Sequence, residues 1–307
     1  MRTDCHQHLW PEALVHALRV RKAPPRLDGW TLHLDGEAPF AASPADHDAA
    51  ARAERELGQR TERILLSLSS PLGIEHLPSA QCAPVLDAWH HGAGALGEPF
   101  WVWAAAGVAE PDPQALTQAL TGDRVVGLQL PATALMEPAA LDRLGPLLEV
   151  LERADRPLLV HPGPAPLLPA ARPLPAWWPA LVPYVCQLHA AWYAWHAAGR
   201  SAHPGLRVAF VALAGLAPLH HERLTARGGA LGRIDQSVFY ETSSYGTRAM
   251  DATVRVVGVD ALVHGSDRPY AEPTGPGFGE AFSHALFVTN PHRLLTGEKG
   301  DGSPSSR

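Results

Sequence analysis

The sequence predicts a (β/α)8 barrel, a single α/β domain in which eight parallel strands alternate with helices. Eight short β-like segments recur along the 307 residues, and each is followed by a helix-like stretch. Strands that alternate with helices pair in parallel, and eight such units close into a barrel. A composition of 46% hydrophobic and 18% charged residues provides a core of the required size. A doubly wound open sheet is the alternative.

The predicted strands are short runs of mainly apolar residues. They cover residues 2–8, 63–69, 100–104, 125–130, 157–161, 206–211, 237–242 and 261–265. The segments between them, such as 138–153, carry apolar residues at helical spacing. The first clear helix is predicted at 46–58.

Two connections, 11–46 and 162–183, are longer than a barrel needs. Both follow the carboxyl end of a strand, the first and the fifth, where barrels build their active sites. We therefore expect them to shape a pocket, although Pro-rich insertions are also tolerated on a surface. We assign the barrel to residues 1–296 and expect the polar, Gly/Ser-rich stretch 297–307 to be a disordered tail.

Charge and cysteine content exclude several classes of protein. The net charge is -6 and no stretch is strongly basic, which argues against nucleic-acid binding. No apolar run is long enough for a membrane span, and no secretory pattern precedes the first strand. The three cysteines form no CxxC pair, so a disulfide framework or a thiolate zinc site is not expected. These features predict a cytoplasmic protein with a small-molecule substrate, as a monomer or a homodimer.

Four residues at strand ends have the side chains of a metal site. His6 and His8 end the first strand, and because side chains alternate they project from one face. His161 ends the fifth strand, and Asp267 follows the eighth. Three imidazoles and a carboxylate suit Zn²⁺, with Mn²⁺ or another divalent ion as the alternative. Taken singly, His161 could be an ordinary strand-end histidine and Asp267 could organise a turn.

Three motifs around these residues resemble the amidohydrolase superfamily, and its amidohydrolase-related branch in particular. That branch includes aminocarboxymuconate semialdehyde decarboxylase and lactonases. The motifs are DCHQHLW at 4–10, LVHP at 159–162 and VHGSDRP at 263–269, and NPHRLL at 290–295 resembles the closing helix of the family. The resemblance implies a barrel with one divalent metal ion held by His6, His8, His161 and Asp267. It also implies that Asp267 is catalytic and deprotonates the water that the metal activates.

The chain departs from the family at two positions. Where the family carries a catalytic histidine after strand six, this sequence has Leu213, which cannot polarise a carbonyl or carry a proton. Another group could replace the histidine, the reaction could need only the metal and Asp267, or catalysis could be lost. Where relatives commonly carry Asp, this chain has Glu241, which is either a partner of a metal ligand or an ordinary strand-end hydrogen-bonding group.

Three further residues are candidates for substrate contact. Arg268 could receive a carboxylate, although a salt bridge on the barrel rim is the alternative. Trp10 lies just past the first two ligands and could wall the pocket, and His189 on a helix could replace the missing histidine. Packing or solvent exposure is the alternative for both.

The sequence therefore predicts a metal-dependent hydrolase that acts on a small lactone, amide or ester through metal-activated water. The first alternative is a non-oxidative decarboxylase of a small unsaturated or aromatic carboxylic acid. The second alternative is a degenerate barrel that binds a metal or a small ligand without turnover, because of Leu213.

Overall fold

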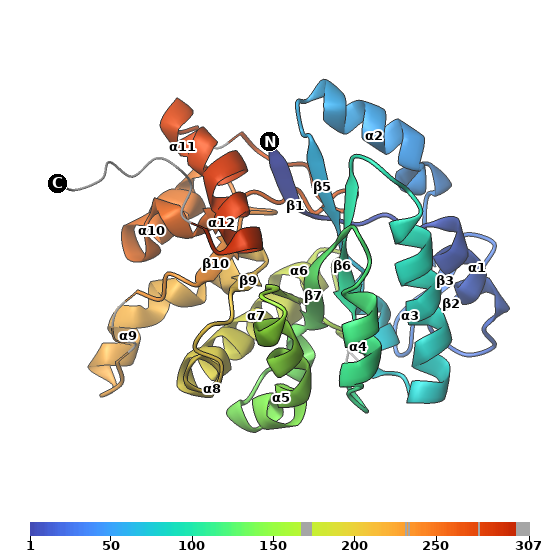
Figure 1. Cartoon of the computed structure of the whole chain (residues 1–307), viewed down its shortest axis with the longest axis horizontal. Helices are drawn as coiled ribbons and strands as arrows, with labels where there is room; N and C mark the ends of the chain where they lie inside the picture. The colour runs from blue at the N-terminus through green and yellow to red at the C-terminus, as the bar shows by residue number, and fades with distance from the viewer. Residues whose placement is uncertain (167–173, 231, 233, 276, 299–307) are drawn as a thin grey trace.

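The computed structural model describes residues 1–166, 174–230, 232, 234–275 and 277–298 (Figure 1). Its main sheet has eight parallel strands in the order β1-β5-β6-β7-β8-β9-β10-β11. The first and last strands meet, since the Cys5 amide donates to the His264 carbonyl at 2.8 Å and Gln7 bridges to Arg268. The sheet is therefore a closed barrel, and the predicted (β/α)8 architecture is confirmed.

Each of the eight predicted segments coincides with a barrel strand. Six strands are shorter than predicted, and β6 and β7 each extend one residue further. The strands are β1 (Thr3–Gln7), β5 (Arg63–Leu66), β6 (Phe100–Ala105), β7 (Val125–Pro131), β8 (Leu158–His161), β9 (Val208–Phe210), β10 (Val238–Glu241) and β11 (Leu262–Val263). A small antiparallel sheet of β2 (Arg26–Asp28), β3 (Thr31–His33) and β4 (Phe40–Ala41) lies in the connection after β1.

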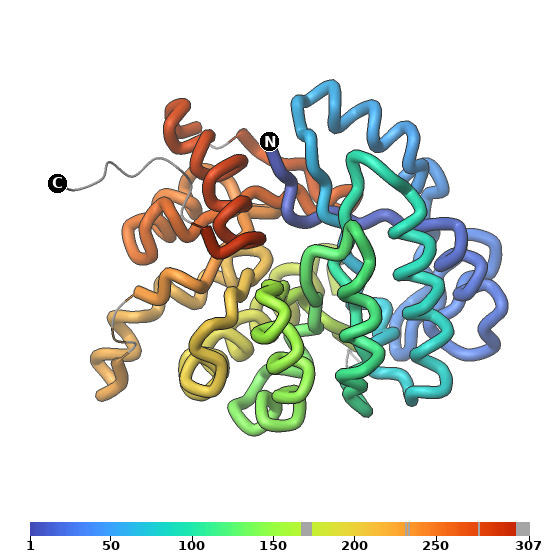
Figure 2. Tube along the Cα trace, in the orientation of Figure 1, coloured from blue at the N-terminus to red at the C-terminus, as the bar shows by residue number. Residues whose placement is uncertain are grey.

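Helices surround the barrel, and the last ones pack near the start of β1 (Figure 2). The α-helices are α1 (Glu12–Val20), α2 (Ala49–Gly58), α3 (Ser79–Gly94), α4 (Pro113–Ala119), α5 (Pro138–Arg153), α6 (Trp178–Leu181), α7 (Pro183–Ala194), α8 (Arg200–Ala202), α9 (His221–Ala226), α10 (Thr247–Val257), α11 (Glu280–His284) and α12 (Asn290–Thr296). The predicted helix at 138–153 is confirmed with the same bounds. Its leucines at positions 141, 144, 147, 148 and 151 form the buried face.

The prediction that the first helix spans 46–58 is wrong in two respects. Helix α1 precedes it, and its Leu14, Val15 and Leu18 are buried against the barrel layer. Residues 44–47 form a separate 3-10 turn, and α2 begins only after Asp48. The Asp48 carboxylate accepts a hydrogen bond from the Ala51 amide, which caps α2 at that point.

Both long connections line a cavity of about 540 Å³. Residues between Ala23 and Glu37 form one wall, and Pro164 and Pro166 of the connection after β8 contribute to another. The part of that connection at 167–173 lies outside the described residues, as do residues 299–307 of the predicted tail.

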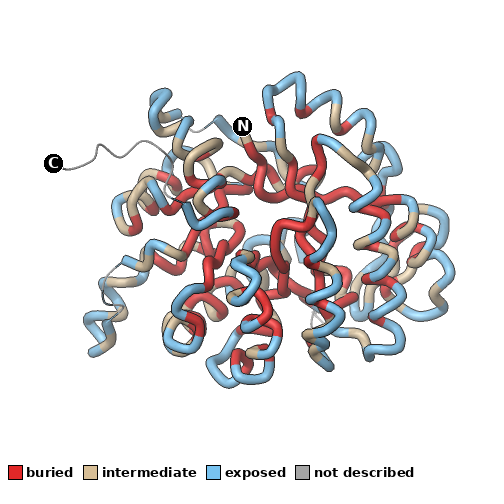
Figure 3. Tube along the Cα trace, in the orientation of Figure 1, coloured by how far each residue is buried: buried red, intermediate tan, exposed pale blue. Residues whose placement is uncertain are grey.

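The barrel strands form the buried centre, and the outward faces of the helices are exposed (Figure 3). Trp89 of α3 and Trp103 of β6 are fully buried, and Trp103 Nε1 donates to the Cys5 carbonyl of β1 at 3.0 Å. No helix within the described residues has the length and apolar character needed to cross a membrane.

Candidate metal centre

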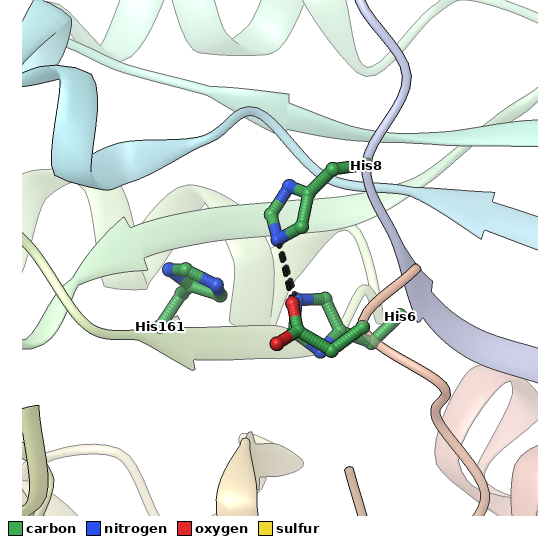
Figure 4. Close-up of side chains that lie close together, drawn as sticks. His6, His8 and His161 are labelled. Carbon is green, nitrogen blue, oxygen red and sulfur yellow. Dashed lines mark hydrogen bonds and ion pairs between the residues drawn. The ribbon is translucent and has the colours of Figure 1, made fainter. Parts of the chain in front are cut away.

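The structure brings the four predicted ligands together at the carboxyl ends of the strands. His6 belongs to β1, His8 follows it, His161 ends β8, and Asp267 lies after β11. One ligand atom of each residue lies within 4.8 Å of those of the other three. The three rings point toward one another from two different strands (Figure 4), with centroids 4.8 to 5.0 Å apart.

The hydrogen bonds around the rings determine which nitrogen carries the proton. His8 Nδ1 lies 3.0 Å from the Ser67 carbonyl oxygen, and His161 Nδ1 lies 2.8 Å from that of Pro162. A carbonyl only accepts, so both Nδ1 atoms donate, and each Nε2 of a neutral ring keeps a lone pair. His6 Nδ1 faces Glu241 Oε2 at 3.4 Å, which favours the same tautomer.

The Nε2 lone pairs converge, and with the neutral rings protonated on Nδ1 no proton is left for a hydrogen bond between the Nε2 atoms. His6 Nε2 and His8 Nε2 are 3.0 Å apart, and Asp267 Oδ1 lies 3.2 Å from His8 Nε2 and 3.7 Å from His6 Nε2. Three imidazole lone pairs and a carboxylate repel one another unless a cation lies between them. The donor set therefore fits a divalent metal ion, for which neutral imidazoles and carboxylates are common ligands.

Burial acts on the charge of these rings. It lowers the pKa of His8, and it lowers the pKa of His161 well below its usual range, with the neighbouring His6 and His8 adding to the effect. Burial also disfavours charge on His6, but hydrogen bonding and attraction to Glu241, together with Asp267 and Asp4, outweigh it and raise the pKa of His6. His8 and His161 are thus held in the neutral form that binds metals.

Asp4 ties the two ligand-bearing segments to each other. Its Oδ1 accepts from the backbone amides of His6 and Ser266, both at 3.1 Å. The Asp267 amide also donates to the His6 carbonyl at 2.9 Å. Asp267 itself has a left-handed backbone with φ of 59°, which is sparsely populated for an aspartate. This network holds an uncommon conformation that turns the Asp267 carboxylate toward the histidines.

Glu241 makes strand-end hydrogen bonds and also faces the ring of a predicted ligand. Its carboxylate accepts from the Ser243 amide and hydroxyl and from the Ala212 amide, at 2.5, 2.7 and 3.1 Å. The same carboxylate faces His6 Nδ1. It also leaves no room for a side chain at Gly265, where an added Cβ would lie 2.1 Å from Glu241 Oε1. Glu241 thus joins the end of β10 to the ring of a predicted ligand.

Leu213 lies in a strained turn directly after β9. Residues 212–216 all have positive φ, from 47° at Ala212 to 62° at Leu216. For residues other than glycine this conformation costs roughly 1–2 kcal/mol each. Gly215 is needed there, because an added Cβ would lie 2.7 Å from the Val185 carbonyl oxygen. Leu213 is fully buried in the main hydrophobic core, so an apolar side chain is accommodated where the family carries a histidine.

The three residues predicted to contact substrate lie in different surroundings. Trp10 is buried, donates from Nε1 to Ser69 Oγ at 3.0 Å and stacks on His47. The Arg268 guanidinium turns toward α2 and pairs with the buried Glu56 at 2.5 Å, so the structure has the salt bridge that was the alternative. His189 is on α7, where its ring contacts His220 and Tyr193 and is not part of the four-residue cluster.

The sequence analysis did not identify the groups that face His8 Nδ1. The Ser67 carbonyl and the Ser69 hydroxyl, the latter at 3.3 Å, both face His8 Nδ1. Tyr270 also lies against the His8 ring with centroids 5.3 Å apart and is half exposed. Three serines at positions 67, 69 and 70, at the carboxyl end of the predicted strand 63–69, were the available signal, since strand ends of barrels face the site.

Comparison with protein-family models gives no match, and comparison with curated proteins finds no similar sequence. Solved structures do match. The IDCase of Metarhizium anisopliae, in apo form, has a TM-score of 0.77 at 18% identity over 97% of this chain and 98% of that one. A 2,6-dihydroxybenzoate decarboxylase from Rhizobium has 0.67 at 18%, over 96% and 98%. A 5-carboxyvanillate decarboxylase from Novosphingobium aromaticivorans, complexed with manganese and 4-hydroxy-3-methoxy-5-nitrobenzoic acid, has 0.65 at 14%, over 96% of both chains.

At these identities the comparison establishes the fold. A further match is an amidohydrolase II, with a TM-score of 0.73. The chain therefore has the same barrel fold as these solved structures.

Proposed function

We propose that this protein is a metal-dependent, non-oxidative decarboxylase of a small aromatic or unsaturated carboxylic acid. The observation that carries the proposal is the convergence of three imidazole lone pairs and the Asp267 carboxylate at the carboxyl end of the barrel. Similar structures that bear an activity in their names include decarboxylases of aromatic acids, which favours this reaction over hydrolysis.

The protein's own groups suit proton delivery to carbon. In decarboxylation the electrons of the breaking carbon–carbon bond remain on the ring or alkene carbon, which must gain a proton as CO₂ leaves. The Asp267 side chain is 22% exposed, whereas those of His6 and His8 are 1% exposed, so Asp267 borders the open side of the cluster. Asp267 Oδ1 faces the histidines. We assign to its Oδ2 the relay of a proton from water to the carbon, after which the carboxylate is restored. A bound divalent ion would supply a Lewis acid that fixes the oxygens of the substrate.

The aromatic ring of Tyr270 lies beside the cluster. The half-exposed Tyr270 ring contacts His8 and could pack against a planar substrate. Burial raises the pKa of Tyr270 to about 12, so its hydroxyl is neutral at working pH. Such a wall suits an aromatic or conjugated acid.

Hydrolysis of a lactone, amide or ester has weaker support. That reaction is helped by a group that polarises the carbonyl or carries a proton, and Leu213 provides neither. Protonation of carbon through Asp267 does not require a polar or proton-carrying side chain at position 213.

The metal is proposed to be divalent, with Mn²⁺ and Zn²⁺ as the two ions to compare. A His₃Asp set binds both, and one structurally similar decarboxylase contains manganese.

The experiment is a paired substrate panel with the protein loaded with Mn²⁺ or Zn²⁺. Hydroxylated benzoates and unsaturated acids are assayed for CO₂ release, and lactones, esters and amides for hydrolysis. We expect CO₂ release from an aromatic or unsaturated acid, and its loss in Asp267→Asn but not in Asp251→Asn, an exposed control on α10. Turnover confined to the hydrolysis panel would contradict the proposal, and metal binding without any turnover would favour the degenerate barrel.

A further inference from the structure

A buried polar cluster contacts residues 67–70, the segment whose carbonyl and hydroxyl groups face His8 Nδ1. It consists of Gln129 on β7, Ser70 at the start of a 3-10 turn (Ser70–Leu72) and Glu75 in the next such turn (Ile74–His76). All three residues are 0% exposed. None of them is a ligand candidate, and the proposed reaction uses none of them.

The cluster has a defined hydrogen-bond direction. Gln129 Nε2 donates to the Leu68 carbonyl and to Ser70 Oγ, both at 2.7 Å. The carbonyl only accepts, so the amide cannot be flipped. Ser70 Oγ, having accepted from Gln129, donates to Glu75 Oε1. Both protons of the Gln129 amide nitrogen and the hydroxyl proton of Ser70 are thus used in hydrogen bonds.

The segment between β5 and the turn connects this cluster to His8. Residues 67–70 alternate in the side they face. Ser67 and Ser69 present a carbonyl and a hydroxyl to His8 Nδ1, at 3.0 and 3.3 Å. Leu68 and Ser70 present a carbonyl and a hydroxyl to Gln129 on the other side. A shift of this segment toward or away from Gln129 would therefore displace the acceptors of the His8 ring.

We propose that Gln129 and Glu75 are positioning residues for His8. They fix the segment 67–70 so that its acceptors hold the proton of His8 on Nδ1 and aim the Nε2 lone pair at the other ligands. Partners of this kind typically change metal affinity by 10–100-fold when they are removed. The inference rests on the proposed metal centre.

Glu75 Oε1 can accept from Ser70 whether or not the carboxyl is protonated. Burial raises its pKa to about 7, against a weaker opposing effect of its hydrogen bond with Ser70. An amide in its place would keep an acceptor for Ser70, whereas an alkyl side chain would not. A positioning role therefore predicts that Gln at position 75 preserves the metal affinity and that Leu does not, whereas a packing role predicts no such difference.

The test measures the affinity for Mn²⁺ and Zn²⁺ by competition with a chromophoric chelator. The variants are Gln129→Leu, Glu75→Leu and Glu75→Gln, each verified as folded by near-ultraviolet circular dichroism. We expect Gln129→Leu and Glu75→Leu to bind metal about 10-fold or more weakly, and Glu75→Gln to stay within about 3-fold of the wild type. In the metal-free protein, imidazole ¹⁵N spectra should show His8 protonated on Nδ1 in the wild type and in Glu75→Gln, and a mixture of tautomers in Gln129→Leu.

Two controls make the result specific. Leu147→Ala removes a fully buried side chain of α5 away from the site, and it should lower stability without changing metal affinity. Gln114→Leu changes an exposed glutamine of α4. Wild-type affinity in both Gln129→Leu and Glu75→Leu would overturn the inference and leave the metal centre intact. A wild-type protein that binds neither ion would overturn the metal centre and the inference with it. If one of the two leucine variants does not fold, the inference is judged on the metal affinity and the His8 tautomer of the other leucine variant.

Discussion

His6 Nε2 and His8 Nε2 lie 3.0 Å apart although each ring already turns its Nδ1 toward an oxygen atom. Two imidazoles in this arrangement have no proton to place between them. With His161 and Asp267 completing the group, the arrangement fits a divalent cation between the four residues. The proposed function rests on this contact and on the groups that surround it.

Replacement of Glu241 should weaken metal binding through His6. Glu241→Gln keeps the size of the side chain and one oxygen that can accept from the Ser243 hydroxyl and the Ala212 amide. It loses the oxygen that accepts from the Ser243 amide and removes the negative charge that faces His6 Nδ1. We expect about a 10-fold loss of metal affinity by chelator competition. Glu222→Gln, at an exposed position of α9, is the control. An unchanged affinity in Glu241→Gln would show that the carboxylate only caps the end of β10.

Replacement of Arg268 should cost stability. The guanidinium pairs with the buried Glu56, and removal of one partner of such a pair typically costs 3–5 kcal/mol. Arg268→Met should therefore shift urea unfolding strongly. Arg255→Met, which breaks an exposed pair on α10, should cost less than about 1 kcal/mol. If Arg268→Met leaves stability unchanged and raises only KM, the predicted role in substrate binding is the better one.

Glu75 should make stability depend on pH. Its pKa is about 7 in the folded protein, above the ordinary 4.5 of an unfolded chain, so the folded state holds the proton more tightly. Its contribution is fully present below pH 4.5 and is lost as pH rises through 7, by up to about 3 kcal/mol. In Glu75→Gln this contribution disappears. The difference between the urea stabilities of the two proteins from pH 5 to pH 8 measures it, and parallel curves would argue against a buried neutral Glu75.

The barrel and the ligand cluster could be predicted from the sequence for the same physical reason. Parallel strands place their carboxyl ends together, so His6, His161 and Asp267 meet although they are far apart in the chain. Helix α5 was predictable because its leucines recur at helical spacing. Helix α1 could have been recognised in the same way, since Leu14, Val15 and Leu18 follow Pro11, but the neighbouring turns and aromatic residues obscured it.

The contacts behind the ligands were not predictable. Arg268 and Glu56 are 212 positions apart, and no local pattern links them. The Gln129–Ser70–Glu75 cluster depends on the turns after β5 meeting a side chain of β7, which is two strands away in the sheet, and on which carbonyls face that side chain. Such contacts are fixed by tertiary packing, which short-range spacing does not encode.

The central claim is that one divalent ion binds between His6, His8, His161 and Asp267. The most direct measurement is elemental analysis of protein purified without chelator, followed by titration of the stripped protein with Mn²⁺ and Zn²⁺. We predict about one divalent ion per chain, and its loss in His8→Ala and Asp267→Ala. A stripped wild-type protein that takes up neither ion, or a variant that still binds one ion with wild-type affinity, would contradict the claim.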